Sequence, residues 1–542
     1  MISLPKEILE RVERVLDYHR VSKHTPDSVR RLKPQTDPAA QPSPVRVFPG
    51  LPKVALPNNI LDIPVPAVEV VREGLGALPG SHIRPPQDLK TVATWLYMAY
   101  GVAVERRVRG GSYFLRTCPS AGALYPCEIY LAAFAIDGLK PGLYSFNPHE
   151  FTLTQLRDGL ETLSHIKRGR PDLAFMKSVP GAVLVSSIFW RSAWKYRVRG
   201  FRVAMLDAGH LIANLVAVAN GLGIQTMTRL KMNDTTIREL TGLWYEHDFG
   251  AFEAVQAMVV WADDANCPLE PPGQPGAPPP LQPIERQPLS NESVPYGSIL
   301  ASHFDCAAPG VAIRDVKPPF TELSPMPLVH ESRQMPEFHK TYGGPTLRQA
   351  LLKRRSSRDF QRRAIPHDAL LAINRSAFRT GTFPPVLPDG PYLGLIRPFW
   401  VIHAVTAVPA GIWYYHPHTD RWVLLVKGDY REMSQAICLG QPRCGNAAAV
   451  CFMVANLDTV MHGAGPDVYR LAHLEAGIAG QRLALAAEAS GVGSCGICSF
   501  YDEEARAFLG LEQSSWEVLY AAAVGVPDAG TGPPGYPGLG IG

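Results

Sequence analysis

The chain has 542 residues, of which 53 are Lys or Arg and 49 are Asp or Glu, so its formal net charge is +4. Hydrophobic residues make up 46% of it and charged residues 19%, a composition typical of packed globular proteins and unlike that of disordered chains. A charge this balanced does not indicate binding to nucleic acid or to a membrane surface. At about 100–200 residues per domain, the length predicts two to four domains.

The sequence also excludes several common targeting signals and binding sites. The start of the chain is charged throughout, which excludes a secretory signal, and no apolar run is long enough to cross a bilayer. The nine cysteines are scattered and odd in number, which favours reduced thiols and a cytoplasmic location. The usual ATP and dinucleotide loops are missing, as are HExxH and a second CxxC to match Cys495 and Cys498, so no metal site is predicted.

Taken in chain order, the predicted elements are short strands and long buried helices. Runs rich in β-branched and aromatic residues predict strands at 128–134, 182–190 and 399–405. Small and apolar residues on nearly every face predict fully buried helices at 206–219 and 474–489. A buried helix flanked by a sheet predicts a three-layer α+β unit.

Proline, with 51 copies, marks the domain boundaries. It is concentrated before residue 86 and again after Cys267, and segments this rich in Pro form few helices and pack poorly. The second stretch is interpreted as a surface linker between two halves. The predicted division is an N-terminal extension 1–80, a first domain 81–265, a linker 266–340, a second domain 341–530 and a Gly/Pro-rich tail 531–542.

The two halves are copies of one another. The helix segment at Leu206 resembles the one at Leu474, and Gly209 aligns with Gly477 at an offset of 268 (477 minus 209). The same offset relates three more pairs without a gap: Gly223 and Gly491, Asp234 and Asp502, and Gly242 and Gly510. The sequence therefore predicts an internal duplication, with the two units packed face to face as an intramolecular pseudo-dimer.

One motif occurs only in the first copy. It is the segment RTCPSAGALYP at 116–126, whose prolines and glycine fix a tight backbone path. Ser120 and the N–H groups of Ala121 to Ala123 can then face a ligand at close range. The duplicated segment at 391–398 keeps the Pro and Gly positions but has Tyr392 in place of Ser120. The alternative interpretation is an ordinary structural loop.

A second motif occurs only in the second copy, at the end of a helix predicted to start near Thr346. The segment KRRSSRDF at 353–360 places three arginines and two hydroxyls within five residues, which favours a phosphate clamp. Its counterpart, GLGALPG at 74–80, has no basic group. The alternative is a solvated basic helix end. Because each copy lacks what the other keeps, we expect one working site per chain, between the copies.

These motifs resemble the nitroreductase superfamily of flavin enzymes and, within it, the SagB-type, McbC-like azoline oxidases. Those enzymes use FMN to oxidise thiazolines and oxazolines in ribosomal peptides. The resemblance rests on the segments YHRVSKHTP (18–26), RTCPSAGALYP (116–126), GLYSFNP (142–148), FWRSAWKYRVRGFRVAMLDAGH (189–210), RRSSRDF (354–360) and GVGSCGICSFYD (491–502). It implies two tandem nitroreductase-like units, whereas usual members carry one unit per chain; whether the fused chain dimerises further stays open.

The resemblance also implies an FMN held across the interface of the two units. The residues that match the phosphate and ribityl contacts are Arg354, Arg355, Ser356 and Arg358. Those that match the segment laid against the flavin ring by the other unit are Pro119, Ser120, Ala121 and Gly122. Those that match the strand approaching the reactive edge of the flavin are Gly496, Ile497, Cys498 and Ser499.

Lys195 and Tyr196 match the pair implicated in deprotonating the substrate. Aromatising a thiazoline removes a hydride, which FMN takes, and a proton, which a nearby base takes. A lysine serves as a base only if its pKa is lowered, and the positive neighbours expected to do this are Arg191, Arg197 and Arg199. The alternative is a surface Lys beside a packed Tyr. His210, by contrast, is interpreted as a core histidine with its hydrogen bonds satisfied.

The favoured function is an FMN-dependent dehydrogenase of an azoline or related group in a peptide-derived natural product. The expected partners are a peptide substrate, O2 as electron acceptor and other enzymes of a biosynthetic cluster, with neither nucleic acid nor membrane. Two alternatives stay open: an NAD(P)H-dependent reductase of nitro or quinone compounds, and a catalytically silent scaffold in a biosynthetic complex. The actual substrate and the role of residues 1–80 are not fixed by the sequence.

Overall fold

The structure is a computed structural model of the chain. It describes residues 4–31, 37–73, 85–108, 111–159, 161–162, 165, 179–230, 234–242, 249–261, 281–307, 344–378, 394–417 and 419–528. The predicted counterpart segment at 74–80, the position of Tyr392 and the tail at 531–542 lie outside these residues.

Two antiparallel sheets with the same strand order form the framework. The larger sheet runs in the order β1 (Lys53–Ala55), β6 (Thr152–Asp158), β5 (Gly142–Asn147), β4 (Cys127–Ala133), β7 (Gly181–Ile188), β9 (Glu253–Trp261), β8 (Thr226–Arg229). The smaller sheet runs in the order β12 (Arg421–Lys427), β11 (Gly411–His416), β10 (Arg397–Ile402), β13 (Ala449–Ala455), β15 (Glu517–Gly525), β14 (Gly493–Ile497). Apart from the added β1, each strand has its equivalent in the other sheet, so the predicted duplication is confirmed.

The helices repeat in the same way. The equivalent pairs are α3 (Ala67–Glu73) and α10 (Leu347–Lys353), α4 (Leu89–Tyr100) and α11 (His367–Phe378), α6 (Phe189–Tyr196) and α14 (Leu457–Ala464), α7 (Gly200–Leu222) and α15 (Asp467–Ala489), α8 (Asp234–Leu240) and α16 (Asp502–Phe508). The remaining helices are α1 (Lys6–Val21), α2 (Pro26–Arg31), α9 (Gly297–Ala307), α12 (Arg431–Ile437) and α13 (Pro442–Asn446). We call α3 to β9 the first half and α10 to β15 the second half.

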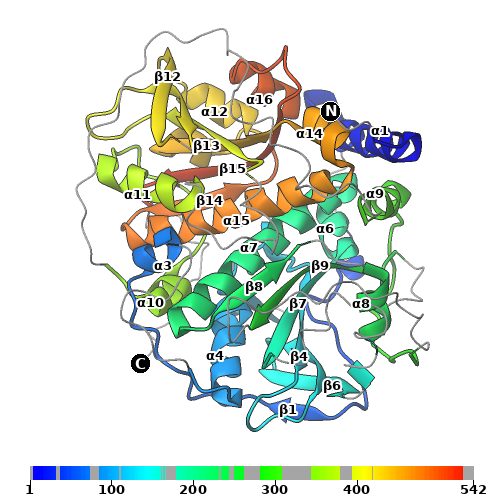
Figure 1. The fold of residues 1–542 in the computed structure, drawn as a ribbon. Helices are drawn as coiled ribbons and strands as arrows, with labels where there is room; N and C mark the ends of the chain where they lie inside the picture. The colour runs from blue at the N-terminus through cyan, green and yellow to red at the C-terminus, as the bar shows by residue number, and fades with distance from the viewer. Residues whose placement is uncertain are drawn as a thin grey trace.

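The long helices α7 and α15 cross at the centre of the molecule, between the two sheets (Figure 1). They meet at Gly209 and Gly477, where a Cβ on either glycine would collide with a backbone carbonyl of the facing helix, Leu474 or Leu206. Both helices are buried along nearly their whole length, as their small and apolar composition predicts. The region Phe189–Leu222 is apolar and long enough to cross a membrane, but 94% of its most apolar window is buried.

A second contact between the halves is reciprocal. The N–H of Leu347 donates to the carbonyl of Val65 (2.8 Å), and the N–H of Ala67 donates to the carbonyl of Pro345 (3.0 Å). These four residues are equivalent in pairs, because α3 and α10 begin at the same point of the repeat. The two hydrogen bonds therefore have the isologous form of a two-fold interface. The repeat as folded begins at residue 65, within the predicted N-terminal extension.

The remaining differences from the predicted elements are local. The predicted strand 182–190 ends at Ile188, and its last two residues begin α6. Helix α9 lies within the predicted linker 266–340, in a stretch without proline, and buries Ile299 and Cys306. The proline-rich composition of the linker as a whole therefore concealed a packed helix. A two-stranded ribbon, β2 (Val102–Val108) and β3 (Gly111–Arg116), leads into the segment that contains Ser120.

Candidate functional site

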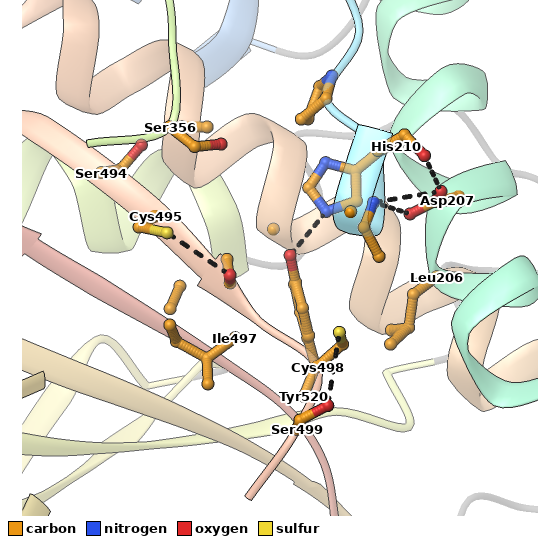
Figure 2. A pocket seen from close by; sticks show the side chains of 18 of the residues that line it. Leu206, Asp207, His210, Ser356, Ser494, Cys495, Ile497, Cys498, Ser499 and Tyr520 are labelled. Atoms are coloured by element: carbon orange, nitrogen blue, oxygen red, sulfur yellow. Dashed lines mark hydrogen bonds between the residues drawn. The ribbon is translucent and has the colours of Figure 1, made fainter. Parts of the chain in front are cut away.

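A cavity of about 1140 Å³, counted to its open mouth, lies between the two halves. Figure 2 shows its walls: α7 carries Asp207 and His210 on one side, and β14 carries Cys495 and Ile497 on the other. About 320 Å³ of this space can hold a ligand, which is at the lower end of the range for ligand pockets. The residues from the first half are Pro119, Ser120, Ala121, Gly122, Lys195, Tyr196, Leu206, Asp207 and His210; the second half adds Arg354, Ser356, Gln441, Arg443, Gly480, Leu483, Ala484, the run 494–499, Tyr520 and Ala522.

Almost every residue predicted for the site lines this one cavity. The exceptions are two arginines of the basic motif. Arg355 donates to the carbonyl of Arg354 (2.6 Å) and Arg358 is exposed, and neither lines the cavity. The cavity thus takes its arginine from the second half and the Ser120 turn from the first, as the complementary loss predicts. The ligand that these residues bind stays a prediction.

The turn from the first half is held by a carboxylate that the sequence did not single out. Ser120 Oγ donates to Asp207 Oδ2 (2.5 Å), and the N–H of Ala121 donates to Oδ1 of the same group (3.1 Å). Gly122 has a φ of 65°, which explains why a glycine is needed there. Burial raises the pKa of Asp207 to about 7, although both hydrogen bonds act to lower it. A carboxyl group at the cavity wall can therefore exchange a proton near neutral pH.

The equivalent carboxylate in the second half makes a different set of contacts. Glu475, at the offset of 268 from Asp207, accepts hydrogen bonds from the N–H groups of Leu395 and Ile396, both at 3.1 Å. Gly394, equivalent to Gly122, keeps a φ of 60°. The turn is thus conserved as a backbone structure in both halves. Among the described residues, Asp207 accepts from a side-chain hydroxyl and a backbone N–H at the cavity wall, whereas Glu475 accepts from two backbone N–H groups.

Lys195 and Tyr196 end helix α6 at the mouth of the cavity. The helix stops there because Arg197 adopts a φ of 52°. A Cβ placed on Gly122 would lie 3.1 Å from Lys195 Nζ, so the turn and the lysine are in direct contact. Lys195 is exposed, whereas burial raises the pKa of the Tyr196 hydroxyl well above its ordinary value, with Cys498 as a hydrogen-bonding neighbour. Tyr196 is therefore protonated at neutral pH.

Two of the three arginines expected near Lys195 make buried ion pairs. Arg191 pairs with Glu128 (2.5 Å) and Arg199 pairs with Asp502 (2.7 Å), and all four side chains are buried. Asp502 is shared between Arg199 and Arg202 (2.9 Å), and the effect of these arginines on Lys195 stays a prediction. Arg199 also donates to the carbonyl of Cys498 (3.0 Å) and so fixes the end of the β14 wall.

Two arginines give the cavity its anion-binding character. Arg354 is buried, donates only to the carbonyl of Thr117 (3.3 and 3.4 Å) and has no carboxylate within ion-pair distance among the described residues. Burial lowers the pKa of Arg354 from its ordinary value, as expected for a cation removed from water. Arg443 donates to Cys495 Sγ (3.3 Å), and its Nε is buried without a partner. Both side chains line the cavity, where an anionic group could pair with either.

Glycines on β14 and α15 make room for Tyr520 at the cavity. A Cβ on Gly496 would collide with the hydroxyl of Tyr520, and one on Gly480 would lie 2.5 Å from the Tyr520 ring. The basic loop is attached to the β14 wall, since the N–H of Ser357 donates to the carbonyl of Ser494 (2.8 Å). A wall of small side chains beside a buried arginine fits a flat, phosphorylated cofactor such as FMN.

The sequence missed several of the lining residues. Asp207 and His210 lie on the helix predicted as buried, where the surrounding apolar pattern hid them. Gln441 and Arg443 belong to a short helix that no motif marked. His210 does have both ring nitrogens paired, as expected of a core histidine, yet it also lines the cavity. Within the described part of the chain, no group of three or more metal-binding side chains is present.

Comparison with known proteins gives a consistent result. The Nitroreductase family model matches residues 85–252 and again residues 351–526, once in each half. A crystal structure of a nitroreductase-like protein from Anabaena variabilis superposes with a TM-score of 0.73 at 24% identity, covering 95% of this chain and 99% of its own. That similarity spans both halves, so the tandem arrangement is a fold shared with another protein.

Three curated relatives match part of the chain. MJ1384 of Methanocaldococcus jannaschii, named as a nitroreductase, is 30% identical over 156 residues, 29% of this chain and 74% of the relative. The trifolitoxin-processing protein TfxB of Rhizobium leguminosarum bv. trifolii is 26% identical over 199 residues, 35% of this chain and 52% of its own. The microcin B17-processing protein McbC of Escherichia coli is 26% identical over 134 residues, 24% and 48% respectively. The matches to TfxB and McbC thus span about half of each relative.

Proposed function

The chain belongs to the nitroreductase family and is an oxidoreductase, and from that premise we propose that it uses one FMN to dehydrogenate an azoline in a peptide-derived compound. The observation that carries the proposal is the composite cavity. Its buried arginine and the β14 wall come from one half, and Lys195, Tyr196 and Asp207 come from the other. The relatives TfxB and McbC, both named for processing peptide toxins, support a peptide substrate.

Each part of the cavity has a place in this proposal. Arg354 and Arg443 would hold the phosphate, Ser356 would add a hydroxyl contact, and the segment Gly496–Ser499 would lie against the ring. Bound FMN supplies a two-electron acceptor for the hydride that leaves the substrate. The Ser120 turn, held by Asp207, would cover the opposite face of the ring and keep water from it.

The proton that leaves the substrate needs an acceptor close to the reacting carbon. Lys195 stands at the mouth, where an entering peptide would cover it and remove it from water. Asp207 lies deeper, with a pKa of about 7. We assign Lys195 as the proton acceptor and Tyr196, which is protonated, as a hydrogen-bond donor to the substrate. Asp207 would hold the turn through Ser120 and Ala121.

The test is the visible spectrum of the purified chain, followed by turnover of a thiazoline-containing peptide in air. We expect one FMN per chain and conversion of thiazoline to thiazole with consumption of O2. Two FMN per chain would contradict the composite site. Rapid reduction of bound FMN by NAD(P)H, with turnover of nitro or quinone compounds and no azoline oxidation, would show the alternative reductase. A chain free of FMN would show a silent scaffold.

A further inference from the structure

A chain of hydrogen bonds runs from the cavity wall into the centre of the molecule. At its inner end Asn214 Nδ2 donates to the carbonyl of Ala99 (3.0 Å), and Gln481 Nε2 donates to Asn214 Oδ1 (2.5 Å). Gln481 Oε1 lies 2.9 Å from His210 Nδ1, and His210 Nε2 lies 3.0 Å from the hydroxyl oxygen of Tyr520. Figure 2 shows its outer end, with the Tyr520 hydroxyl pointing to the His210 ring.

The backbone carbonyl at the inner end sets the direction of every link. A carbonyl oxygen only accepts, so Asn214 must present its NH2 to Ala99 and its oxygen to Gln481. Gln481 must then donate to Asn214 and turn its own oxygen toward His210. The ring nitrogen that faces this oxygen, Nδ1, must carry the hydrogen. In a neutral imidazole the other nitrogen, Nε2, is bare and accepts from Tyr520.

We propose that this chain commits the Tyr520 hydroxyl hydrogen to His210, so that Tyr520 can only accept a hydrogen bond from the ligand in the cavity. Its oxygen lies against the α-carbon of Gly496, on the β14 wall of the cavity. His210, Gln481 and Asn214 are positioning residues. Where the ligand is FMN, which rests on the proposed function, the group that donates to Tyr520 is a ring N–H or a ribityl hydroxyl.

Burial keeps the chain in this one state. All four side chains are buried. Burial lowers the pKa of His210 to about 4, and the positive charge of Arg354 lowers it further. The hydrogen bond that His210 donates to Gln481 acts to raise the pKa of His210 but is the weaker effect. The imidazole is therefore neutral at physiological pH, and Nε2 remains an acceptor. Burial also raises the pKa of Tyr520 well above its ordinary value, so the phenol keeps its hydrogen.

The arrangement belongs to one site only. At the offset of 268, His210 corresponds to Ile478 and Asn214 to Arg482, while Gln481 corresponds to Ala213. Tyr520 pairs with Met453 in the smaller sheet. The residue equivalent to Met453 in the larger sheet is Val185, which pairs with Ala257, so Ala257 is the counterpart of Tyr520. None of these four counterparts can build the chain. The network therefore accompanies the equipped cavity and is not a requirement of the fold.

The first experiment measures the tautomer directly. Uniform 15N labelling of the histidines, with His210 assigned by its absence in a His210→Gln variant, should give a protonated Nδ1 and a bare Nε2 between about pH 5.5 and 8. A Gln481→Leu variant, which removes the anchor, should give a mixture of the two tautomers. A wild-type His210 that carries its hydrogen on Nε2 would overturn the inference. This measurement does not depend on any flavin.

The second experiment measures the acceptor role with FMN itself. The Tyr520→Phe variant should bind FMN about 5-fold more weakly, the effect of losing one hydrogen bond. Tyr144→Phe is the matched control, because the Tyr144 hydroxyl donates to the carbonyl of Lys140 (2.6 Å) away from the cavity. Equal or tighter binding by Tyr520→Phe would overturn the acceptor role. If wild-type chain binds no FMN, the proposed function fails, whereas the tautomer result tests the hydrogen-bond chain alone.

Discussion

The two sites related by the duplication share a backbone and differ in their chemistry. At the equipped site, β14 presents Gly496 to the cavity, and at the equivalent position β8 presents Thr228. Lys195 corresponds to Gly463. In the second site the region around Arg482 is covered by α3, since Arg482 donates to the carbonyl of Val71 (2.9 Å). The repeat thus keeps its backbone on both sides, whereas, among the described residues, the predicted site groups gather on one side.

This difference has a simple physical origin. Packing at the centre is reciprocal, so a change in either copy of Gly209 or Gly477 affects both halves. Each of the two sites between the halves uses a different set of residues from each copy. The residues of one site can therefore change without affecting the other site. At one site Arg354 is buried without a carboxylate partner among the described residues, whereas its counterpart segment 74–80 lies outside them. Substitutions in the shared framework should therefore act differently from substitutions in the cavity lined by Lys195, Asp207 and Arg354.

The largest effect is expected on turnover when the proposed proton acceptor is removed. Lys195→Ala should retain FMN but lower the rate of azoline oxidation by about 10²- to 10⁴-fold, the usual contribution of a general base. The measurement is single-turnover reduction of bound FMN by substrate under anaerobic conditions. Lys53→Ala is the control, because Lys53 pairs with Glu150 on the surface (2.7 Å). Unchanged flavin reduction in Lys195→Ala would exclude its role as the base.

A second prediction concerns the carboxyl that faces only the equipped site. Because the pKa of Asp207 is about 7 in the folded chain, above its ordinary value of 3.8, the folded state holds a proton that the unfolded state has lost. The stability contributed by this proton is complete below about pH 4 and is lost as pH rises through 7. The expected slope is about 1.4 kcal/mol per pH unit between those limits.

Urea unfolding of the wild type and of Asp207→Asn across this range measures the effect. As pH rises, the free energy of unfolding of the wild type should fall relative to that of Asp207→Asn. Ser120→Ala removes a hydrogen bond that lowers the pKa of Asp207, so its window should extend to higher pH. Parallel pH curves for wild type and Asp207→Asn would contradict a raised pKa.

Much of this arrangement could be predicted from the sequence. The gapless offset around Gly209 and Gly477 required two equivalent buried helices, and the complementary motifs required a site between the halves. Arg355 and Arg358 could not be separated from Arg354 in advance, because three neighbouring arginines look alike until the helix end directs them. Asp207 was hidden because its partner, Ser120, lies 87 residues away in the chain. Such a pairing depends on tertiary packing rather than on local pattern.

Two of those three arginines, Arg354 and Arg358, can show where the anion is bound. Arg354→Ala should weaken FMN binding about 100-fold, since it removes a buried charge from the proposed phosphate contact. Arg358→Ala, its matched control in the same motif, should have little effect because Arg358 is exposed and does not line the cavity. Isothermal titration with FMN measures both. Equal losses in the two variants would place the phosphate outside the cavity.

The smallest effect, about 1–3 kcal/mol, is expected from the shared framework and should be equal in both halves. Gly209→Ala and Gly477→Ala each place a methyl group against a carbonyl of the facing helix, Leu474 or Leu206, so each should destabilise the chain by a similar amount. Gly297→Ala, where a Cβ meets nothing within 4 Å, is the control and should stay within about 0.5 kcal/mol of wild type. Denaturant unfolding measures all three. A loss confined to one glycine would show that the crossing is not reciprocal, because a true two-fold contact cannot distinguish its two copies.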